Sequence, residues 1–322
     1  MISFDKRLAR ALSLLGPSGA YGLAANEISA CNDNALFLTA DLCFFSGLEK
    51  YRKTFPDKLY NFGIAEQNML GAAAGFAKEG FQPFVSTYAS FCCSRCADQV
   101  RVCMSYMKLP IKLIGLTAGY GAGILGATHI SLEDLSVFRA LPNITVISPA
   151  DCIEIVKTMV AISKTNDPTY IRLTGPVNTP IVYTEDYNFE IGKAIKLKEG
   201  KDVCIFATGS MVYQSLKAAD ILEKEGIACS VINIHTIKPI DKECILNATK
   251  KHKLMVCVEE HNIIGGLFSA ISEIVIQENT RVRIIPIGIN DKFVHAGDYK
   301  YQLELSELTF DYIVKRIVYE FK

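Results

Sequence analysis

The feature that most restricts the possible folds is a repeated alternation of short β-type runs with helical stretches. Six such runs occupy the first part of the chain: ALFLTAD, KLYNFGI, FQPFVSTYA, IKLIGLTAG, ITVISPAD and TYIRLTG. Helical stretches lie between them, for example residues 65–80 and 151–164. Buried strands connected by helices of this length are typical of a parallel sheet covered on both faces.

The alternation lapses and then restarts. Residues 176–200 are rich in Pro, Asn, Thr and charged side chains, and we place a linker at 181–200. Four further runs follow with helical stretches among them: DVCIFATGS, ACSVINIH, KLMVCVEEH and VRIIPIGI. The 322 residues suffice for two domains of ordinary size. The sequence therefore predicts an α/β fold with two doubly wound domains, at 1–180 and, smaller, at 201–322.

Charge and apolar patterning exclude some classes of partner. Lys plus Arg equals Asp plus Glu, 34 each, so no overall field attracts nucleic acid or an acidic membrane. No uncharged apolar run reaches the roughly 18 residues of a membrane span. The N-terminus weakly imitates a signal peptide, but Asp5 lies among its basic residues and Gly16-Pro17 interrupts its apolar part. We therefore expect a first helix and a cytoplasmic protein.

The eleven cysteines are scattered, odd in number and mostly inside apolar runs, which indicates reduced, buried thiols. Cys93 and Cys96 form a Cys-x-x-Cys pair within residues 91–103. A metal or redox site would need a second ligand pair or a thioredoxin-like context, and neither is visible in the sequence. We predict no metal ligands on this chain.

Residues 61–76, NFGIAEQNMLGAAAGF, place Glu66 among small and apolar side chains near a predicted helix N-terminus. An acid in a first turn can simply complement the helix dipole, and taken alone the residue favours that interpretation. A carboxyl group in apolar surroundings is, however, disfavoured as an anion and can hold a proton. Residues elsewhere in the sequence are needed to distinguish a helix-dipole role of Glu66 from a role as a proton-holding acid.

The chain resembles the thiamine-diphosphate enzymes of the transketolase family, specifically the C-terminal half of a transketolase. The resemblance covers nearly the whole chain in the family's order and runs through these segments: GIAEQNMLGAAAGFAKEGFQPFVSTYASF, ADQVRV, GATH, LED, FRALPNITVISPAD, TYIRL, FATGSMV, INIHTIKPID, VEEHNIIGG and GIND. It implies a pyrimidine-binding domain at 1–180 and a transketolase C-terminal-like domain at 201–322.

The resemblance implies specific site residues. Glu66 would hydrogen-bond N1′ of the cofactor's aminopyrimidine and stabilise the tautomer that removes the thiazolium C2 proton. Tyr88 and Phe91 would pack the pyrimidine ring, whereas Ser94 replaces a third aromatic residue of many relatives. His129 would face the substrate and hydrogen-bond its oxygens. Asp41 matches a family aspartate at the edge of the active site.

One family motif is missing. The family holds the diphosphate and its divalent metal with Gly-Asp-Gly and a later Asn, and this chain contains no Gly-Asp-Gly. The resemblance therefore implies a separate N-terminal, diphosphate-binding subunit that carries this motif, in an α2β2-like assembly. The cofactors would be thiamine diphosphate and Mg²⁺ or Ca²⁺, the metal being bound mainly by that partner.

The substrate-facing positions depart from the family. Ile124 and Leu125 replace an acidic pair of many transketolases, and Thr117 aligns with a histidine of many relatives. Of the arginines that clamp a sugar phosphate, only Arg172 remains nearby, which argues against ordinary pentose phosphates. An apolar Leu125 suits a donor that lacks one hydroxyl. These departures favour unusual or non-phosphorylated sugars.

The predicted reaction is transfer of a two-carbon ketol unit from a ketose to an aldehyde. An alternative keeps the cofactor but decarboxylates a 2-oxo acid, as in the beta subunit of 2-oxo-acid dehydrogenases or in 1-deoxyxylulose-5-phosphate synthase. The GATH, LED and RALPN segments favour transketolase. A second alternative is a non-catalytic regulatory subunit, which the set of Glu66, Tyr88, Phe91 and His129 disfavours.

Overall fold

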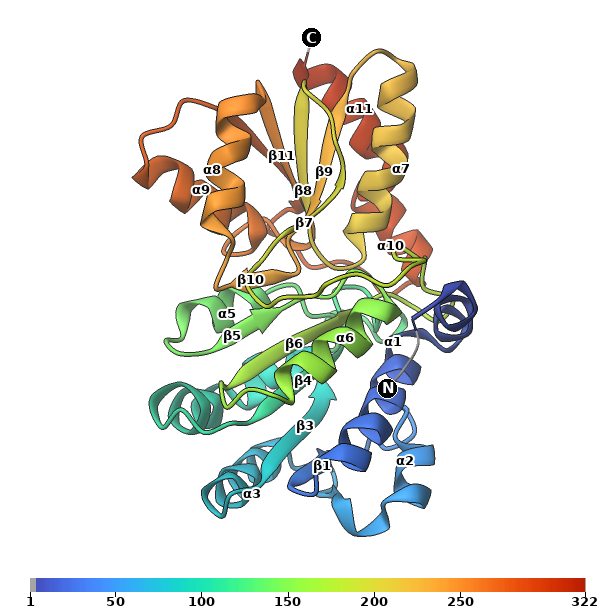
Figure 1. The fold of residues 1–322 in the computed structure, drawn as a ribbon, viewed down its shortest axis with the longest axis vertical. Coiled ribbons are helices and arrows are strands. Elements are labelled where there is room, and N and C mark those ends of the chain that lie inside the picture. The colour runs from blue at the N-terminus through green and yellow to red at the C-terminus, as the bar shows by residue number, and fades with distance from the viewer. Residues whose placement is uncertain (1–3, 322) are drawn as a thin grey trace.

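The computed structural model describes residues 4–321 and contains two sheets, one above the other in Figure 1. The first has seven strands in the order β10-β5-β6-β4-β3-β1-β2. They are β1 (Ala35–Thr39), β2 (Leu59–Asn61), β3 (Gln82–Tyr88), β4 (Lys112–Ala118), β5 (Thr145–Ile147), β6 (Thr169–Thr174) and β10 (Thr236–Lys238). The second has the order β12-β11-β8-β9-β7. Its strands are β7 (Ile195–Lys198), β8 (Val203–Ala207), β9 (Cys229–Asn233), β11 (Leu254–Asn262) and β12 (Arg283–Ile289).

Both sheets are mainly parallel. In the first sheet only the edge strand β10 runs antiparallel to its neighbour, β5. In the second sheet only the edge strand β7 does so, against β9. Every residue of β1, β6 and β8 is buried, as expected for strands covered by helices on both faces. The near-continuous apolar runs of the sequence are therefore inner strands.

Helices cover both faces of each sheet. One core cluster unites residues of α1 (Lys6–Cys31), α6 (Cys152–Ile162), α7 (Met211–Lys224) and α11 (Phe310–Phe321) with one face of the sheets. The other cluster unites α3 (Glu66–Lys78), α5 (Asp134–Ala140), α8 (Lys242–Lys251) and α9 (Leu267–Gln277) with the opposite face. The predicted fold class, two doubly wound α/β domains, is confirmed.

Short helical elements complete the chain. They are α2 (Glu49–Thr54), 3₁₀ turns at Pro56–Lys58 and Gly123–Leu125, π-helical turns at Phe91–Arg95 and Val100–Tyr106, α4 (Ala97–Gln99) and α10 (Tyr299–Leu305). The helix expected at the N-terminus is α1, which bends at Gly16-Pro17. Within residues 4–321, no helix combines the length and apolar character needed to cross a bilayer.

Two strands complicate the division at 181–200, which remains a prediction. Residues 195–198 of the expected linker form β7 and pair with β9, so they belong to the second sheet. Residues 236–238, which follow β9, return to the first sheet as β10. Lys238 Nζ donates to the carbonyl oxygen of Arg139 at 3.0 Å and also to that of Leu141. The two domains are thus connected by strand pairing as well as by the linker.

Candidate active site

Glu66 is the first residue of α3 and follows a short loop after β2. Gly63 in this loop has φ +70°, a left-handed conformation that glycine adopts without strain. The Glu66 side chain is only 3% exposed, and its Oε1 accepts a hydrogen bond from the Arg95 guanidinium at 2.7 Å. The helix N-terminus also favours a negative charge here. Glu66 is thus a buried carboxyl group with one charged partner.

Tyr88, Phe91 and His129 form an aromatic cluster. Their ring centroids lie 5.9 Å apart for Tyr88 and Phe91, 5.4 Å for Tyr88 and His129, and 5.2 Å for Phe91 and His129. All three pairs meet edge to face, the arrangement that aromatic quadrupoles prefer. Burial raises the pKa of the Tyr88 hydroxyl. Residues from the end of β3 and from the loop after β4 therefore build one half-buried surface.

Arg95 connects this aromatic cluster to Glu66. Its guanidinium carbon lies 3.8 Å from the centroid of the Phe91 ring, at cation–π distance. The π-helical turn Phe91–Arg95 places both residues on the same side of the chain that leaves β3. Sequence analysis did not identify Arg95, because a residue 29 positions from Glu66 gives no local signal of the contact.

Asp41 lies at the end of β1, with φ +57°. Its backbone N–H donates to Asn61 Oδ1 at 3.0 Å, and Asn61 Nδ2 donates to Asp41 Oδ1 at 3.3 Å. The same Asn61 Oδ1 accepts the N–H of Gly63 at 3.0 Å. Asn61, another residue that sequence analysis missed, thus holds Asp41 against the loop that leads to Glu66.

Tyr88 is the last residue of β3, and Asp41, Glu66 and His129 follow the neighbouring strands β1, β2 and β4 of the first sheet. The order β4-β3-β1-β2 brings together the carboxyl ends of strands that lie far apart in sequence. In open parallel sheets this edge is where ligands bind. The fold therefore gathers these four predicted residues at one edge.

The loop after β4 carries the positions at which the sequence departs from its family. Ile124 and Leu125 lie in the 3₁₀ turn Gly123–Leu125 and are 72% and 47% exposed. His129 follows, with its Nδ1 2.9 Å from Thr128 Oγ1. The apolar side chains of Ile124 and Leu125 are thus exposed on the loop that leads to His129.

Thr117, at the end of β4, is unusual in its backbone. Its φ is +51°, which is rare for a β-branched residue, and its buried Oγ1 has no hydrogen-bond partner in the described structure. Strain of this kind concentrates at functional sites. This backbone conformation could not be predicted, because secondary-structure propensities do not indicate a positive φ at a threonine.

Arg172 lies in the interior of the protein. Its side chain is 1% exposed, and its Nε donates to Asp134 Oδ2 at 2.8 Å. A second nitrogen donates to the carbonyl oxygens of Glu260 at 2.8 Å and Ser131 at 3.3 Å. These groups enclose Arg172, which braces the segment that follows His129. The enclosure disfavours the predicted contact with a substrate.

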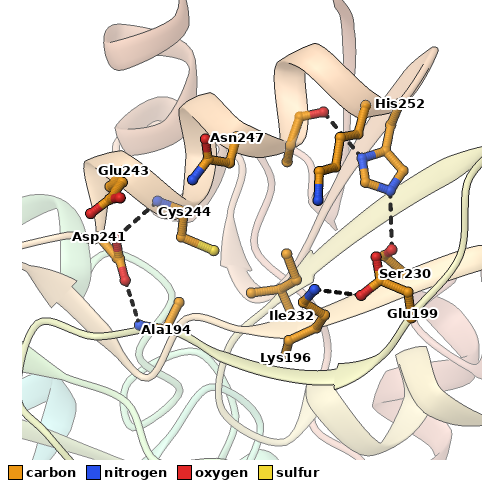
Figure 2. A pocket seen from close by; sticks show the side chains of 12 residues that line it. Ala194, Lys196, Glu199, Ser230, Ile232, Asp241, Glu243, Cys244, Asn247 and His252 are labelled. Carbon is orange, nitrogen blue, oxygen red and sulfur yellow. Dashed lines mark hydrogen bonds and ion pairs between the residues drawn. The ribbon is translucent and has the colours of Figure 1, made fainter.

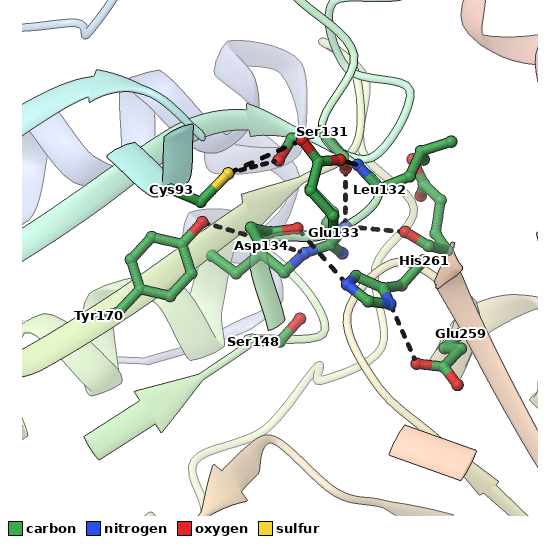
Figure 3. A network of polar contacts seen from close by, with 12 residues as sticks. Cys93, Ser131, Leu132, Glu133, Asp134, Ser148, Tyr170, Glu259 and His261 are labelled. Atoms are coloured by element: carbon green, nitrogen blue, oxygen red, sulfur yellow. Dashed lines mark hydrogen bonds and ion pairs between the residues drawn. The ribbon is translucent and has the colours of Figure 1, made fainter. Parts of the chain in front are cut away.

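Asp134 is the centre of a buried polar network, shown in Figure 3. The Tyr170 hydroxyl donates to Asp134 Oδ2 at 2.7 Å, and His261 Nε2 lies 3.9 Å from Asp134 Oδ1. Burial lowers the pKa of His261 to about 4 and raises that of Glu259 to about 7. Glu259 accepts the N–H groups of Leu267 and Phe268, at 2.6 and 3.0 Å, at the start of α9. This network is structural.

A separate pocket of about 500 Å³ lies in the second domain, between α8 and the strands β7 and β9 (Figure 2). Asp241 accepts the N–H groups of Ala194 at 3.0 Å and Cys244 at 2.9 Å. The His252 ring bonds to Ser230 at 3.0 Å. Some polar groups of this pocket therefore bond to each other or to backbone, and the pocket shares no residue with the site around Glu66.

No group of His, Cys, Asp and Glu side chains in residues 4–321 has the arrangement of a metal site. Cys93 contacts the Ser90 carbonyl oxygen at 3.4 Å, and burial raises the pKa values of Cys92, Cys93 and Cys96. These thiols are protonated and packed in the core.

Comparison with known proteins places this geometry in a family. Residues 17–176 match the transketolase pyrimidine-binding domain, and residues 192–313 match the transketolase C-terminal domain. A putative transketolase C-terminal section from Methanocaldococcus jannaschii is 36% identical over 94% of this chain and 95% of its own length. A 6-deoxy-6-sulfo-D-fructose transketolase subunit from Clostridium sp. (strain MSTE9) is 37% identical, over 90% of this chain and 89% of its own.

A solved structure agrees. A split-gene transketolase, described as an inactive beta4 tetramer, superimposes with a TM-score of 0.83 at 37% identity, over 92% of this chain and 94% of its own. The two-domain α/β fold is thus shared with a solved relative. The chain belongs to the transketolase family. Membership implies dependence on thiamine diphosphate.

The residues at the site fit the pyrimidine part of this cofactor. Glu66 is buried, and only its Oε1 is engaged, by Arg95, which itself lies against the ring of Phe91. Within residues 4–321, no donor reaches the second oxygen, Oε2. An acceptor next to aromatic faces suits a flat heterocycle that carries polar nitrogens.

Proposed function

We propose that this chain is the pyrimidine-binding subunit of a two-subunit, thiamine-diphosphate-dependent enzyme of the transketolase type. It transfers a two-carbon ketol unit from a ketose to an aldehyde. The observation that carries the proposal is the buried Glu66 carboxyl group, 3% exposed, which Arg95 connects to the cluster of Tyr88, Phe91 and His129. The cofactor supplies the nucleophilic carbon.

We assign the residues of this chain the following roles. Glu66 holds a proton at N1′ of the aminopyrimidine, Tyr88 and Phe91 pack against its ring, and Asp41 borders the site. His129, half-buried in the aromatic cluster, hydrogen-bonds the oxygens of the substrate and assists proton movements. The role of Asp41 is supported by its hydrogen bonds to Asn61, which holds the loop before Glu66.

We propose a separate partner subunit that carries Gly-Asp-Gly, binds the diphosphate and Mg²⁺ or Ca²⁺, and assembles with this chain as α2β2. The absence of Gly-Asp-Gly from the sequence supports this proposal. So does the solved relative whose assembly of beta chains alone is described as inactive. The loops that follow β1 and β2 carry exposed apolar side chains: Phe44 is 71% exposed, Phe45 60% and Ile64 78%. The second of these loops leads to Glu66. Apolar patches of this kind mark protein interfaces.

We propose substrates that differ from ordinary pentose phosphates, because Arg172 is buried and Leu125 stands where many relatives have an acid. The relative from Clostridium carries the name of an unusual sugar, 6-deoxy-6-sulfo-D-fructose, which supports this class of donor. We also propose a cytoplasmic location, since all eleven cysteines are free thiols.

The test is reconstitution with the diphosphate-binding subunit and thiamine diphosphate, followed by detection of ketol transfer between sugars. Glu66→Gln keeps the shape of the side chain but removes its acid, and we expect loss of transfer at unchanged thermal stability. Glu304→Gln, on the exposed face of α10, is the control and should transfer normally. Release of CO2 from pyruvate instead of ketol transfer would support the decarboxylating alternative. Full activity of Glu66→Gln would support the non-catalytic one.

A further inference from the structure

Arg95 is the only charged group in hydrogen-bonding contact with Glu66 in the described residues. Its Nη1 donates to Oε1 at 2.7 Å, and the guanidinium lies 3.8 Å from the centroid of Phe91. The Arg95 side chain is 41% exposed, whereas Glu66 is 3% exposed. One end of the ion pair is therefore enclosed and the other is open to the surface of the site.

Other titratable groups near Glu66 do not compete with this pairing. Cys92 and Cys96 are the thiols whose pKa values respond to the charge of Glu66. Burial raises the pKa of Cys96 to about 12, and it raises that of Cys92 as well, so both are neutral at physiological pH. The guanidinium of Arg95 is therefore the positively charged group in contact with the Glu66 carboxyl group.

The contact divides the two oxygens of Glu66. Oε1 is engaged by a charge-assisted hydrogen bond, the stronger kind, which also fixes the rotation of the carboxyl group. Oε2 remains for a second donor.

We propose that Arg95 is a positioning residue for Glu66. Its guanidinium holds Oε1 and thereby fixes the rotation of the carboxyl group, which leaves Oε2 for N1′ of the aminopyrimidine. The same guanidinium packs against the ring of Phe91, so Arg95, which follows Ser94 in the sequence, contacts both Glu66 and an aromatic residue proposed to bind the pyrimidine. This proposal rests on the proposed function, which supplies the aminopyrimidine.

The test uses the complex reconstituted with the diphosphate-binding subunit and loaded with thiamine diphosphate. Two properties are measured without any sugar: the dissociation constant of the cofactor, and the rate at which its C2 proton exchanges with deuterium, by NMR after acid quench. Arg95→Met keeps the length and apolar contact of the side chain but removes its charge, and Arg95→Lys keeps the charge but not the flat guanidinium.

We expect Arg95→Met to slow exchange by about tenfold or more, because a carboxyl group without its charge-assisted hydrogen bond is no longer held in position for N1′. Arg95→Lys should restore part of the rate, which a role in packing alone would not predict. Arg316→Met is the matched control, since Arg316 likewise pairs with a buried carboxylate, Glu320, at 2.8 Å in α11. It should exchange at the wild-type rate.

The outcomes separate this proposal from the proposed function. If Glu66→Gln abolishes exchange while Arg95→Met exchanges at the wild-type rate, the role of Arg95 is wrong and that of Glu66 stands. Tighter cofactor binding by Arg95→Met would also overturn the proposal, since it would mean that Arg95 occupies the place of the ring. If Glu66→Gln itself exchanges normally, the proposed function fails.

Discussion

Glu260 of the second domain accepts the backbone N–H of Tyr120, in the first domain, at 2.6 Å. Its other oxygen accepts the Tyr299 hydroxyl at 2.5 Å and also the Ser210 hydroxyl. Tyr120 begins the loop that carries Leu125 and His129. One buried carboxyl group therefore helps to hold the loop that carries Leu125 and His129 to the second domain.

This arrangement predicts a large loss of stability in Glu260→Ala. The change leaves three buried donors without an acceptor, and we expect the free energy of unfolding to fall by about 3–5 kcal/mol, as when one partner of a buried polar pair is removed. Urea denaturation measures it. Glu304→Ala, whose carboxylate is exposed on α10, should change stability by less than about 0.5 kcal/mol. A similar small change in Glu260→Ala would contradict the prediction.

Arg172→Met should affect stability rather than substrate binding. It leaves the Asp134 carboxylate buried without its guanidinium partner, and we expect a loss of about 3–5 kcal/mol. The KM for the ketose donor, measured well below the melting temperature, should stay at the wild-type value. The control is Arg283→Met, because Arg283 is 58% exposed and its partner Glu320 keeps a second ion pair with Arg316; the change should cost about 1 kcal/mol or less. A raised KM without loss of stability would return Arg172 to the substrate site.

Leu125→Asp tests the choice of donor. The side chain is 47% exposed, so the fold should tolerate the change. An acid restores an acceptor for a sugar hydroxyl, and kcat/KM for a donor with that hydroxyl, relative to one without it, should rise by about 10–100-fold. Steady-state kinetics of the reconstituted complex with the two donors measure the ratio. Ile276→Asp, on exposed α9, should leave it unchanged. An unchanged ratio in Leu125→Asp would remove this residue from the donor site.

His235 predicts a pH dependence of stability. Burial lowers its pKa to about 4, against about 6.5 in an unfolded chain. Its contribution is fully present above pH 6.5 and is lost as the pH falls from 6.5 to 4, because only the unfolded state binds the proton there. This loss amounts to about 3 kcal/mol. His235→Asn should therefore show a flatter unfolding free energy across this window. Parallel curves for the two proteins would contradict this.

Much of the fold follows from local patterns, because buried parallel strands are read as continuous apolar runs. The strands at 35–39, 82–88 and 169–174 lie inside the predicted runs, and α3 begins at Glu66 as expected. β10 was not foreseen, since a strand of three residues has no periodicity of its own and is defined only by its partner β5.

The candidate site shows the same division. Glu66, Tyr88, Phe91 and His129 could be selected through their resemblance to a family, and the structure places them around one edge of the sheet. The contact of Arg95 with Glu66 depends on π-helical turns that change the direction of side chains, which no sequence pattern revealed. The buried position of Arg172 was not predicted, because burial of an arginine is decided by distant partners, here Asp134 and the carbonyl of Glu260.

The return of β10 to the first sheet has a mechanical consequence. A force that pulled the domains apart would have to peel this strand from β5 and release the Lys238 ammonium from the carbonyl of Arg139 before either core opened. It would also expose the edge of β5, a surface on which other chains could add strands. A fragment that ends at residue 200 would lack β10 and would therefore be prone to aggregate through the exposed edge of β5. In the intact chain, the backbone hydrogen bonds between β10 and β5 oppose hinge motion between the two domains.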